Sequence, residues 1–177
     1  MRFAQDAFAA WAELEEDAGE RVIFPTGGID LYPASAPDRV QAYVDSLDEV
    51  GVGYEWMDAA GARRRWPQWR LDDDVRVMFQ EATGIVAAAR ANAAHRGLAE
   101  RAGATLLDRA GVTEIRDAGG LYELATEQGA FRAERVILAT DAWTNELLGQ
   151  LWRPINLTVT QEQVHYYESR DVEAFRP

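Results

Sequence analysis

The chain opens with apolar residues at helical spacing. They recur every three or four positions and so lie on one face of a helix that Gly19 ends; the set is Phe3, Ala7, Trp11 and Leu14. Two short apolar runs follow, Val22 to Phe24 and Gly28 to Tyr32, with paired glycines in the turn between them. This part of the chain predicts a helix followed by two strands.

The next segment again alternates helix and strand. An apolar stripe that begins after Pro37 predicts a helix and consists of Val40, Tyr43, Val44 and Leu47. Tyr54 to Met57 predicts a short strand, and Asp58 suits the N-cap of a further helix that Pro67 terminates. The alternation over Val75 to Gln80 predicts another strand.

In the second half, the period of the apolar pattern changes from helix to strand. An alanine-rich helix reaches Ala102, and Gly103 ends it. Short strands are then predicted at Ala104 to Leu107, Val112 to Ile115, Tyr122 to Thr126 and Val136 to Leu138. A last long strand is predicted over Leu157 to Tyr167. The order of elements indicates a mixed α/β or α+β fold.

Composition and charge narrow the classes of partner. Of the 177 residues, 47% are hydrophobic and 10% aromatic, which is enough for a sizeable core. Lys and Arg total 18 against 30 Asp and Glu, a formal net charge of -12 that repels nucleic acid and anionic membrane surfaces. We therefore expect neither nucleic acid nor membrane as a partner.

The absence of cysteine excludes disulfides, thiol nucleophiles and thiolate metal ligands. No apolar run is long enough to span a bilayer, and an acidic helix stands where a signal peptide would have its apolar core. We expect a cytoplasmic protein. The two histidines, His95 and His165, offer no metal spacing, and Asp72 to Asp74 predicts a solvated turn, so we expect no metal site.

The stretch from Arg135 to Leu148 is the most informative for function. Val136 to Leu138 is a continuous apolar run, typical of a buried strand in a parallel sheet. The small residues Ala139 and Thr140 follow, and Asp141 or Thr144 can cap the next helix. Such a strand-to-helix corner is where doubly wound sheets bind their ligands.

Together with Gly103 to Val112 and Gln161 to Tyr167, this stretch resembles flavin-dependent amine oxidases of the sarcosine oxidase and N-methyltryptophan oxidase type, within the D-amino-acid-oxidase-like family. The resemblance implies FAD as cofactor. It implies oxidation of secondary or N-methylated amines or amino acids as the activity, with a small amine as substrate.

The resemblance also implies site residues at matching positions. The backbone of Val112 corresponds to a contact with the adenine of FAD. Ala139, Thr140, Asp141 and Trp143 correspond to a family motif near the flavin's phosphate and ribitol, in which Asp141 replaces the usual glycine. Each has a structural alternative: an ordinary strand residue for Val112, a helix cap for Asp141 and a packing residue for Trp143.

On the substrate side, the closing motif of the family places Gln163 on a strand that leads toward the substrate pocket, and His165 on the same strand could face that cavity. His95 borders the apolar stripe of the alanine-rich helix, where a half-exposed histidine is ordinarily structural. No nucleophile, base and orienting group can be assembled, so no catalytic residue is predicted.

The chain has no Gly-x-Gly-x-x-Gly turn, which a self-contained dinucleotide-binding protein requires. Because that turn lies at the extreme N-terminus of the family, we expect an internal fragment, inactive alone, that binds FAD weakly or not at all. Residues 1–25 and 84–150 would form a partial FAD-binding layer, interleaved with a partial antiparallel-sheet substrate domain of residues 26–83 and 151–177.

Two alternatives stay open: a stand-alone binding or interaction module, and one half of a split flavoenzyme. If the fragment folds alone, exposed core surface should drive a homodimer or a swapped dimer.

Overall fold

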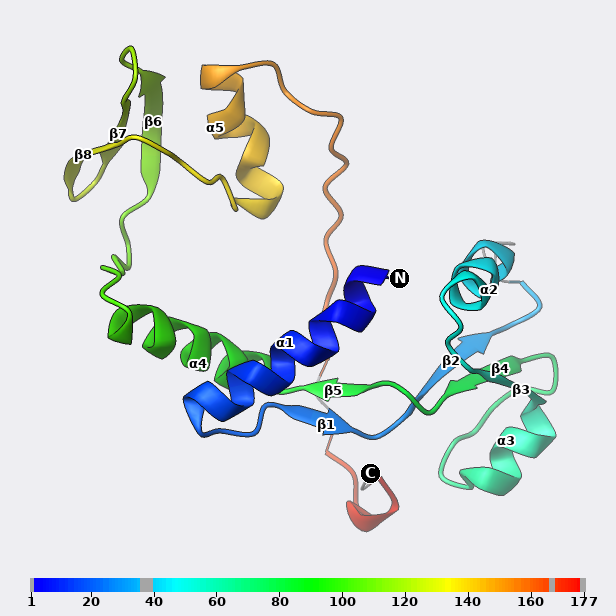
Figure 1. The fold of residues 1–177 in the computed structure, drawn as a ribbon. Coiled ribbons are helices and arrows are strands. Elements are labelled where there is room, and N and C mark those ends of the chain that lie inside the picture. The colour runs from blue at the N-terminus through cyan, green and yellow to red at the C-terminus, as the bar shows by residue number, and fades with distance from the viewer. Residues whose placement is uncertain (1, 36–39, 166–167, 176–177) are drawn as a thin grey trace. The chain divides into compact units, whose positions relative to one another are not determined.

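The computed structural model describes residues 2–35, 40–165 and 168–175 and divides into two compact units. The first unit comprises Met1–Thr105 with Glu168–Pro177, and the second comprises Leu106–Tyr167 (Figure 1). Small antiparallel sheets and helices make up both units, so the predicted mixed α/β class is confirmed.

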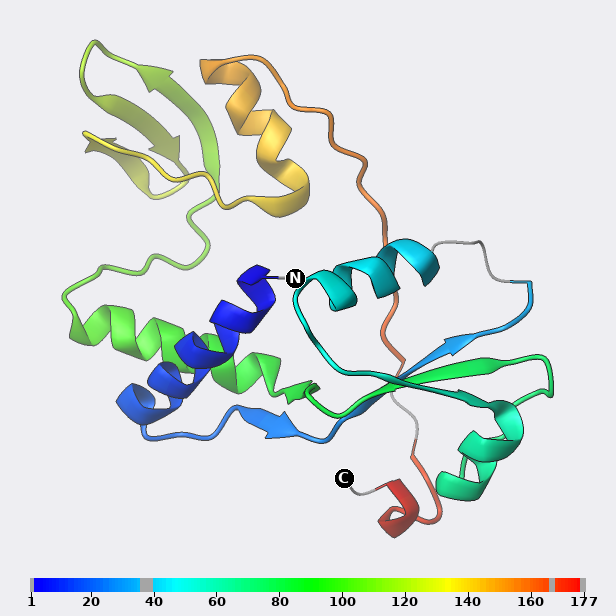
Figure 2. The same ribbon diagram turned by 45° about the vertical axis from the view of Figure 1, so that its right-hand side comes forward.

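The first unit contains a three-stranded antiparallel sheet with a helix on each face, shown in Figures 1 and 2. Its strand order is β2 (Gly28–Tyr32), β4 (Arg76–Gln80), β3 (Glu55–Asp58), and the helices are α2 (Val40–Glu49) and α3 (Ala59–Arg65). Side chains alternate along β4: Val77 packs with Ala59 and Ala62 of α3, while Gln80, on the opposite face, donates to the Tyr43 hydroxyl of α2 at 2.9 Å.

Several local predictions hold in this sheet. Asp58 caps α3 by accepting the Gly61 N–H at 2.6 Å, as the sequence predicted. The fully buried residues of the region include Leu47, Val77 and Met78, which belong to the predicted helix stripe and strand. Pro37, expected to begin α2, lies outside the described residues.

The rest of the first unit pairs two helices above a two-stranded ribbon. Helix α1 (Arg2–Ala18) packs against α4 (Ala88–Arg101), and the ribbon is formed by β1 (Ile23–Pro25) and β5 (Gly84–Val86). The buried cluster that joins these elements consists of Leu14, Val22, Ala91 and Ala94. A short turn of 3₁₀ helix, η2 (Glu173–Phe175), also belongs to this unit and places Phe175 edge-on to Trp69.

The second unit is an antiparallel meander covered by one helix. Strands β6 (Val112–Asp117), β7 (Tyr122–Thr126) and β8 (Gly129–Ala133) pair in sequence order, and α5 (Thr144–Leu151) packs against β6. Ile115 and Leu147 are its buried apolar side chains among the described residues. The Ile115 N–H donates to Oε1 of Gln150 at 3.0 Å, which ties β6 to α5.

Three predicted strands are wrong as strands. No ladder forms at residues 104–107 or 136–138, nor over the described part of the last stretch, residues 157–165; Tyr166 and Tyr167 lie outside the described residues. Val136 to Leu138 is not buried as predicted, since Ile137 is 92% exposed. The physical reason is that a strand needs a neighbouring backbone to pair with, and no described segment supplies one there.

Candidate functional site

The corner after residue 138 holds most of the predicted cofactor residues. It runs through the 3₁₀ turn η1 (Asp141–Trp143) directly into α5. The Trp143 N–H donates to the Thr140 carbonyl at 2.9 Å, and the Thr144 hydroxyl donates to the Asp141 carbonyl at 2.7 Å. These two local bonds fix the direction in which α5 leaves the corner.

Asp141 has a left-handed backbone, with φ of 45°. Non-glycine residues rarely adopt this conformation, and Asp and Asn tolerate it better than most. This backbone conformation explains why a glycine suits this position. It also explains why an aspartate can replace the glycine, since Asp tolerates a positive φ better than most residues. The predicted helix cap is wrong: α5 begins without a side-chain cap, and within the described part of the chain neither Asp141 nor Thr144 accepts a backbone N–H of that helix.

The corner forms one wall of a small hollow of about 170 Å³. Asp141 and Ala142 face the extended segment over residues 157–160 across it, and the polar groups of the opposite wall include those of Thr158 and Thr160. The structure thus brings Asp141 together with the start of the closing segment that sequence analysis placed near the substrate.

Of the predicted site residues, only Asp141 lines this hollow. Ala139 is exposed, Thr140 is half-buried and Trp143 is 64% exposed. Val112 begins β6 opposite Thr126, next to a β-bulge, and does not line the hollow. Gln163 and His165 are exposed on the extended segment and also lie outside the hollow.

The remaining histidine has a packing contact. The His95 ring lies 5.7 Å from the ring of Trp11, between α4 and α1. Among the described residues, no group of three or more His, Cys, Asp or Glu side chains is arranged to hold a metal ion.

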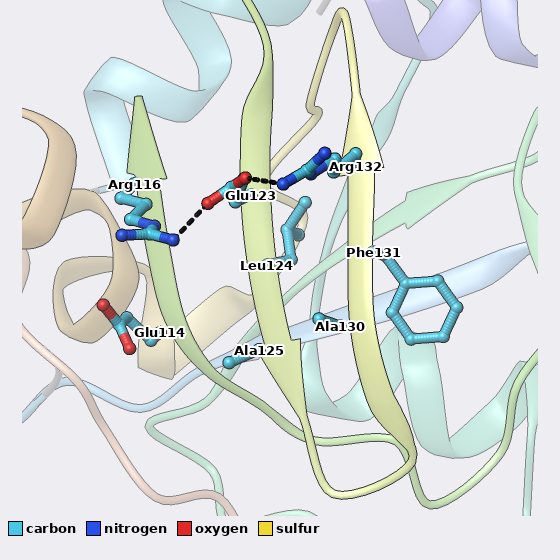
Figure 3. A pocket seen from close by; sticks show the side chains of 8 residues that line it. All are labelled: Glu114, Arg116, Glu123, Leu124, Ala125, Ala130, Phe131 and Arg132. Atoms are coloured by element: carbon cyan, nitrogen blue, oxygen red, sulfur yellow. Dashed lines mark ion pairs between the residues drawn. The ribbon is translucent and has the colours of Figure 1, made fainter. Parts of the chain in front are cut away.

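A second hollow lies on the outer face of the meander and was not predicted from the sequence. It has a volume of about 310 Å³ and is shown in Figure 3. Arg116 from β6 and Arg132 from β8 both form ion pairs with Glu123 on the central strand β7, the second at 2.6 Å. The hairpin register places these three side chains opposite one another, and this register could have been read from the two turns.

The charge of Glu123 is stabilised by its two neighbours. Desolvation alone would raise the pKa of Glu123, but hydrogen bonds and the positive charges of Arg116 and Arg132 lower it below its usual value. Because Arg116 lies on β6, Glu123 on β7 and Arg132 on β8, the two ion pairs link the three strands.

The residues at this corner do not by themselves fit the diphosphate of a dinucleotide. A diphosphate group is ordinarily held by backbone N–H groups of a glycine-rich turn at a helix N-terminus. At this corner the Trp143 N–H is bonded to Thr140, and the ionisable side chain that lines the hollow is the carboxylate of Asp141. Two like charges would repel there, so any diphosphate must be held by residues beyond those at this corner.

No helix among the described residues combines the length and the apolar character that crossing a lipid bilayer demands.

Relatives of known name match nearly the whole chain. Monomeric sarcosine oxidase from Arthrobacter sp. (strain TE1826) is 25% identical over 166 residues, which are 94% of this chain and 43% of that enzyme. N-methyl-L-tryptophan oxidase from Escherichia coli (strain K12) is 29% identical over 142 residues, 80% of this chain and 38% of the relative. The chain thus spans less than half the length of the curated relatives it matches.

Solved structures agree with these matches. The open form of NikD, an amino acid oxidase essential for nikkomycin biosynthesis, superposes with a TM-score of 0.72 at 28% identity, covering 84% of this chain and 38% of NikD. Glycine oxidase from Geobacillus kaustophilus gives a TM-score of 0.66 at 28% identity, covering 80% of this chain and 39% of the oxidase. Residues 1–175 match the family described as FAD dependent oxidoreductase (DAO), and the chain therefore belongs to that family, as its sequence motifs indicated.

Proposed function

We propose that these residues are part of an FAD-dependent oxidase of secondary or N-methylated amines or amino acids. The match of residues 1–175 to the family carries the proposal, because it covers both compact units. Sarcosine oxidase and N-methyl-L-tryptophan oxidase among the relatives support a small N-methylated amine as the substrate class. The absence of cysteine suits an enzyme of the reducing cytoplasm.

In this proposal, the second unit contributes to the cofactor side. The backbone of Val112 contacts the adenine, and Ala139, Thr140, Asp141 and Trp143 lie near the phosphate and ribitol. Gln163 and His165 face the substrate. The division into a FAD-binding layer of residues 1–25 and 84–150 and a substrate domain of residues 26–83 and 151–177 is part of the same proposal.

The 177 residues alone should be inactive and should bind FAD weakly or not at all. The sequence lacks the Gly-x-Gly-x-x-Gly turn, and Asp141 adds a negative charge at the corner. The test is to purify the chain, add FAD, remove free cofactor and record the absorbance between about 350 and 500 nm, where the flavin that carries the redox chemistry absorbs. A tightly retained flavin band would refute this prediction.

The split-enzyme alternative is favoured by the apolar side chains that the second unit leaves exposed, which include Ile137, Trp143 and Trp152. Co-expression with a polypeptide that carries the dinucleotide-binding turn should then yield a yellow complex that oxidises amines. A stand-alone binding module predicts instead a colourless, stable monomer. A homodimer or swapped dimer of the isolated chain would show the same exposed surfaces covering one another.

A further inference from the structure

The side chain of Asn145 binds both backbone polar groups of one residue on the chain that returns after α5. Its Nδ2 donates to the Ile155 carbonyl at 2.9 Å, and the Ile155 N–H donates to its Oδ1 at 2.9 Å. Because a side-chain amide carries a donor and an acceptor as a peptide group does, these two bonds reproduce the exchange of N–H and C=O between paired residues of antiparallel strands. Asn145 therefore does for Ile155 what a neighbouring strand does elsewhere in this unit.

The Asn145–Ile155 pair is where the returning chain is attached to α5. Figures 1 and 2 show the chain leaving the end of α5 in an extended form. Among the described residues, the backbone of residues 156–164 forms no hydrogen bond with another residue. The wall of the hollow that faces Asp141 begins at Leu157, shortly after the pair. The distance between that wall and Asp141 therefore depends on Asn145.

Helix α5 is a firm support for this pair. Its Leu147 is buried in the second unit, and near the end of the helix Gln150 accepts the Ile115 N–H of β6 at 3.0 Å. Asn145 itself is half-buried and caps no helix, since α5 begins without a side-chain cap. Its amide is thus committed to the returning segment, and α5 connects that segment to the meander.

We propose that Asn145 is a positioning residue, which holds residues 155–160 against the corner that contains Asp141. It thereby sets where Gln163 and His165, further along the same segment, lie relative to that corner. This inference rests on the proposed function, in which the corner belongs to the cofactor side and Gln163 and His165 face the substrate. Without the pair, the segment would have to be ordered each time a substrate binds. The free energy of that ordering would be lost from substrate binding.

Amide hydrogen exchange of the 177-residue chain, read residue by residue by NMR, tests the pair itself. After correction for intrinsic rates, we expect the Ile155 amide to exchange about 10-fold more slowly than the amides of residues 157–160. Asn145→Ala should remove this difference. The Ile115 amide should stay protected in both proteins, which would show that α5 still packs on β6.

Asn92→Ala is the matched control. Asn92 is an exposed residue of α4, and its side chain forms no hydrogen bond with another described residue. Both variants replace Asn by Ala within a helix, so both gain the same helix propensity, and both should melt close to the wild type. Asn92→Ala should leave the protection of the Ile155 amide unchanged. An Ile155 amide that exchanges equally fast in the wild type and in Asn145→Ala would overturn the proposal.

Steady-state kinetics of the assembled oxidase, in which these residues are joined by the polypeptide that carries the dinucleotide-binding turn, tests the consequence for catalysis. Asn145→Ala should raise the KM for the amine about 10-fold and leave kcat and the flavin absorbance unchanged, as expected for a loss of binding common to ground state and transition state. Asn92→Ala should change none of these. An unchanged KM together with loss of Ile155 protection would overturn the positioning role. A protected Ile155 amide in an assembled protein that oxidises no amine would instead reject the proposed function and confirm that Asn145 holds the segment.

Discussion

The carboxylate of Glu15 accepts a hydrogen bond from the backbone N–H of Val22 at 2.6 Å, and the same oxygen accepts the next N–H along the chain at 2.7 Å. Glu15 lies on α1, and Val22 is fully buried just before β1. One side chain therefore satisfies two backbone donors where the chain turns from helix to strand, which fixes the entry into the ribbon.

Replacement of Glu15 by Ala should lower the melting temperature in a pH-dependent way. Backbone hydrogen bonds from Ile23 and Val22 lower the pKa of Glu15 below its usual 4.5. A depressed folded-state pKa means that the stabilisation is fully present above the usual value and is lost as the pH falls through the folded value. The difference in melting temperature between wild type and Glu15→Ala should be largest near about pH 7 and should shrink toward about pH 3.

Glu16→Ala is the matched control for this prediction, because the neighbouring Glu16 side chain forms no hydrogen bond or ion pair with another described residue. It should change the melting temperature little at either pH. An effect of Glu16→Ala as large as that of Glu15→Ala would mean that the loss reflects helix charge alone.

Gly84→Ala should destabilise the protein by about 2 kcal/mol or more, because the added Cβ would clash with the backbone of the paired strand. A Cβ atom at Gly84 would lie 2.2 Å from the carbonyl oxygen of Phe24, so the β1–β5 pair would have to separate. Gly97→Ala in α4 is the control, since its Cβ would meet only a flexible arginine end at 3.6 Å, and it should stabilise by up to about 1 kcal/mol. Urea unfolding measures both.

Asp141→Gly should be neutral or stabilising, whereas Asp141→Ala should cost about 1 kcal/mol, because an L-residue with a Cβ strains at φ of 45°. Ala142→Gly, one position further in η1, should cost about 1 kcal/mol because it only adds chain entropy. Chemical denaturation of the three variants provides the comparison. A loss of stability in Asp141→Gly equal to that in Ala142→Gly would contradict the conformational reason given for the family glycine.

Leu47→Ala should cost about 2 to 5 kcal/mol, the range for large-to-small changes in a packed core. Leu47 is 1% exposed and comes from the apolar stripe of α2. Leu31→Ala is the control, because Leu31 on β2 is 41% exposed and should lose far less. Similar losses for the two variants, measured by thermal unfolding, would show that α2 does not contribute a true core contact.

Where local chemistry decides the structure, the sequence was sufficient to predict it. The Asp58 cap and the end of α1 at Gly19 follow from side chains and backbone limits within a few residues. The family motif from Ala139 to Trp143 likewise located the corner before η1, and the identity of the family followed from the same residues.

The candidate site was only partly predictable. Neither Asp141 nor Thr144 became a cap: the chain enters α5 through a 3₁₀ turn in which the Trp143 N–H donates to the Thr140 carbonyl, and the Thr144 hydroxyl donates to the Asp141 carbonyl. The hollow between Asp141 and residues 157–160 depends on how the chain returns after α5, and the Arg116–Glu123–Arg132 cluster depends on strand register. The hollow is not visible in a linear pattern, whereas the cluster requires the strand register that the two turns set.

The sequence by itself determined the main helices, the strands β6 and β7 of the first hairpin, the lack of cysteine chemistry and membership in the FAD dependent oxidoreductase family, but it did not predict β8, the partner of β7. Only the tertiary structure decided which apolar runs become paired strands. Apolar periodicity is not enough for that decision, because a run such as Val136 to Leu138 records a preference for burial, while a ladder forms only where a second backbone lies alongside.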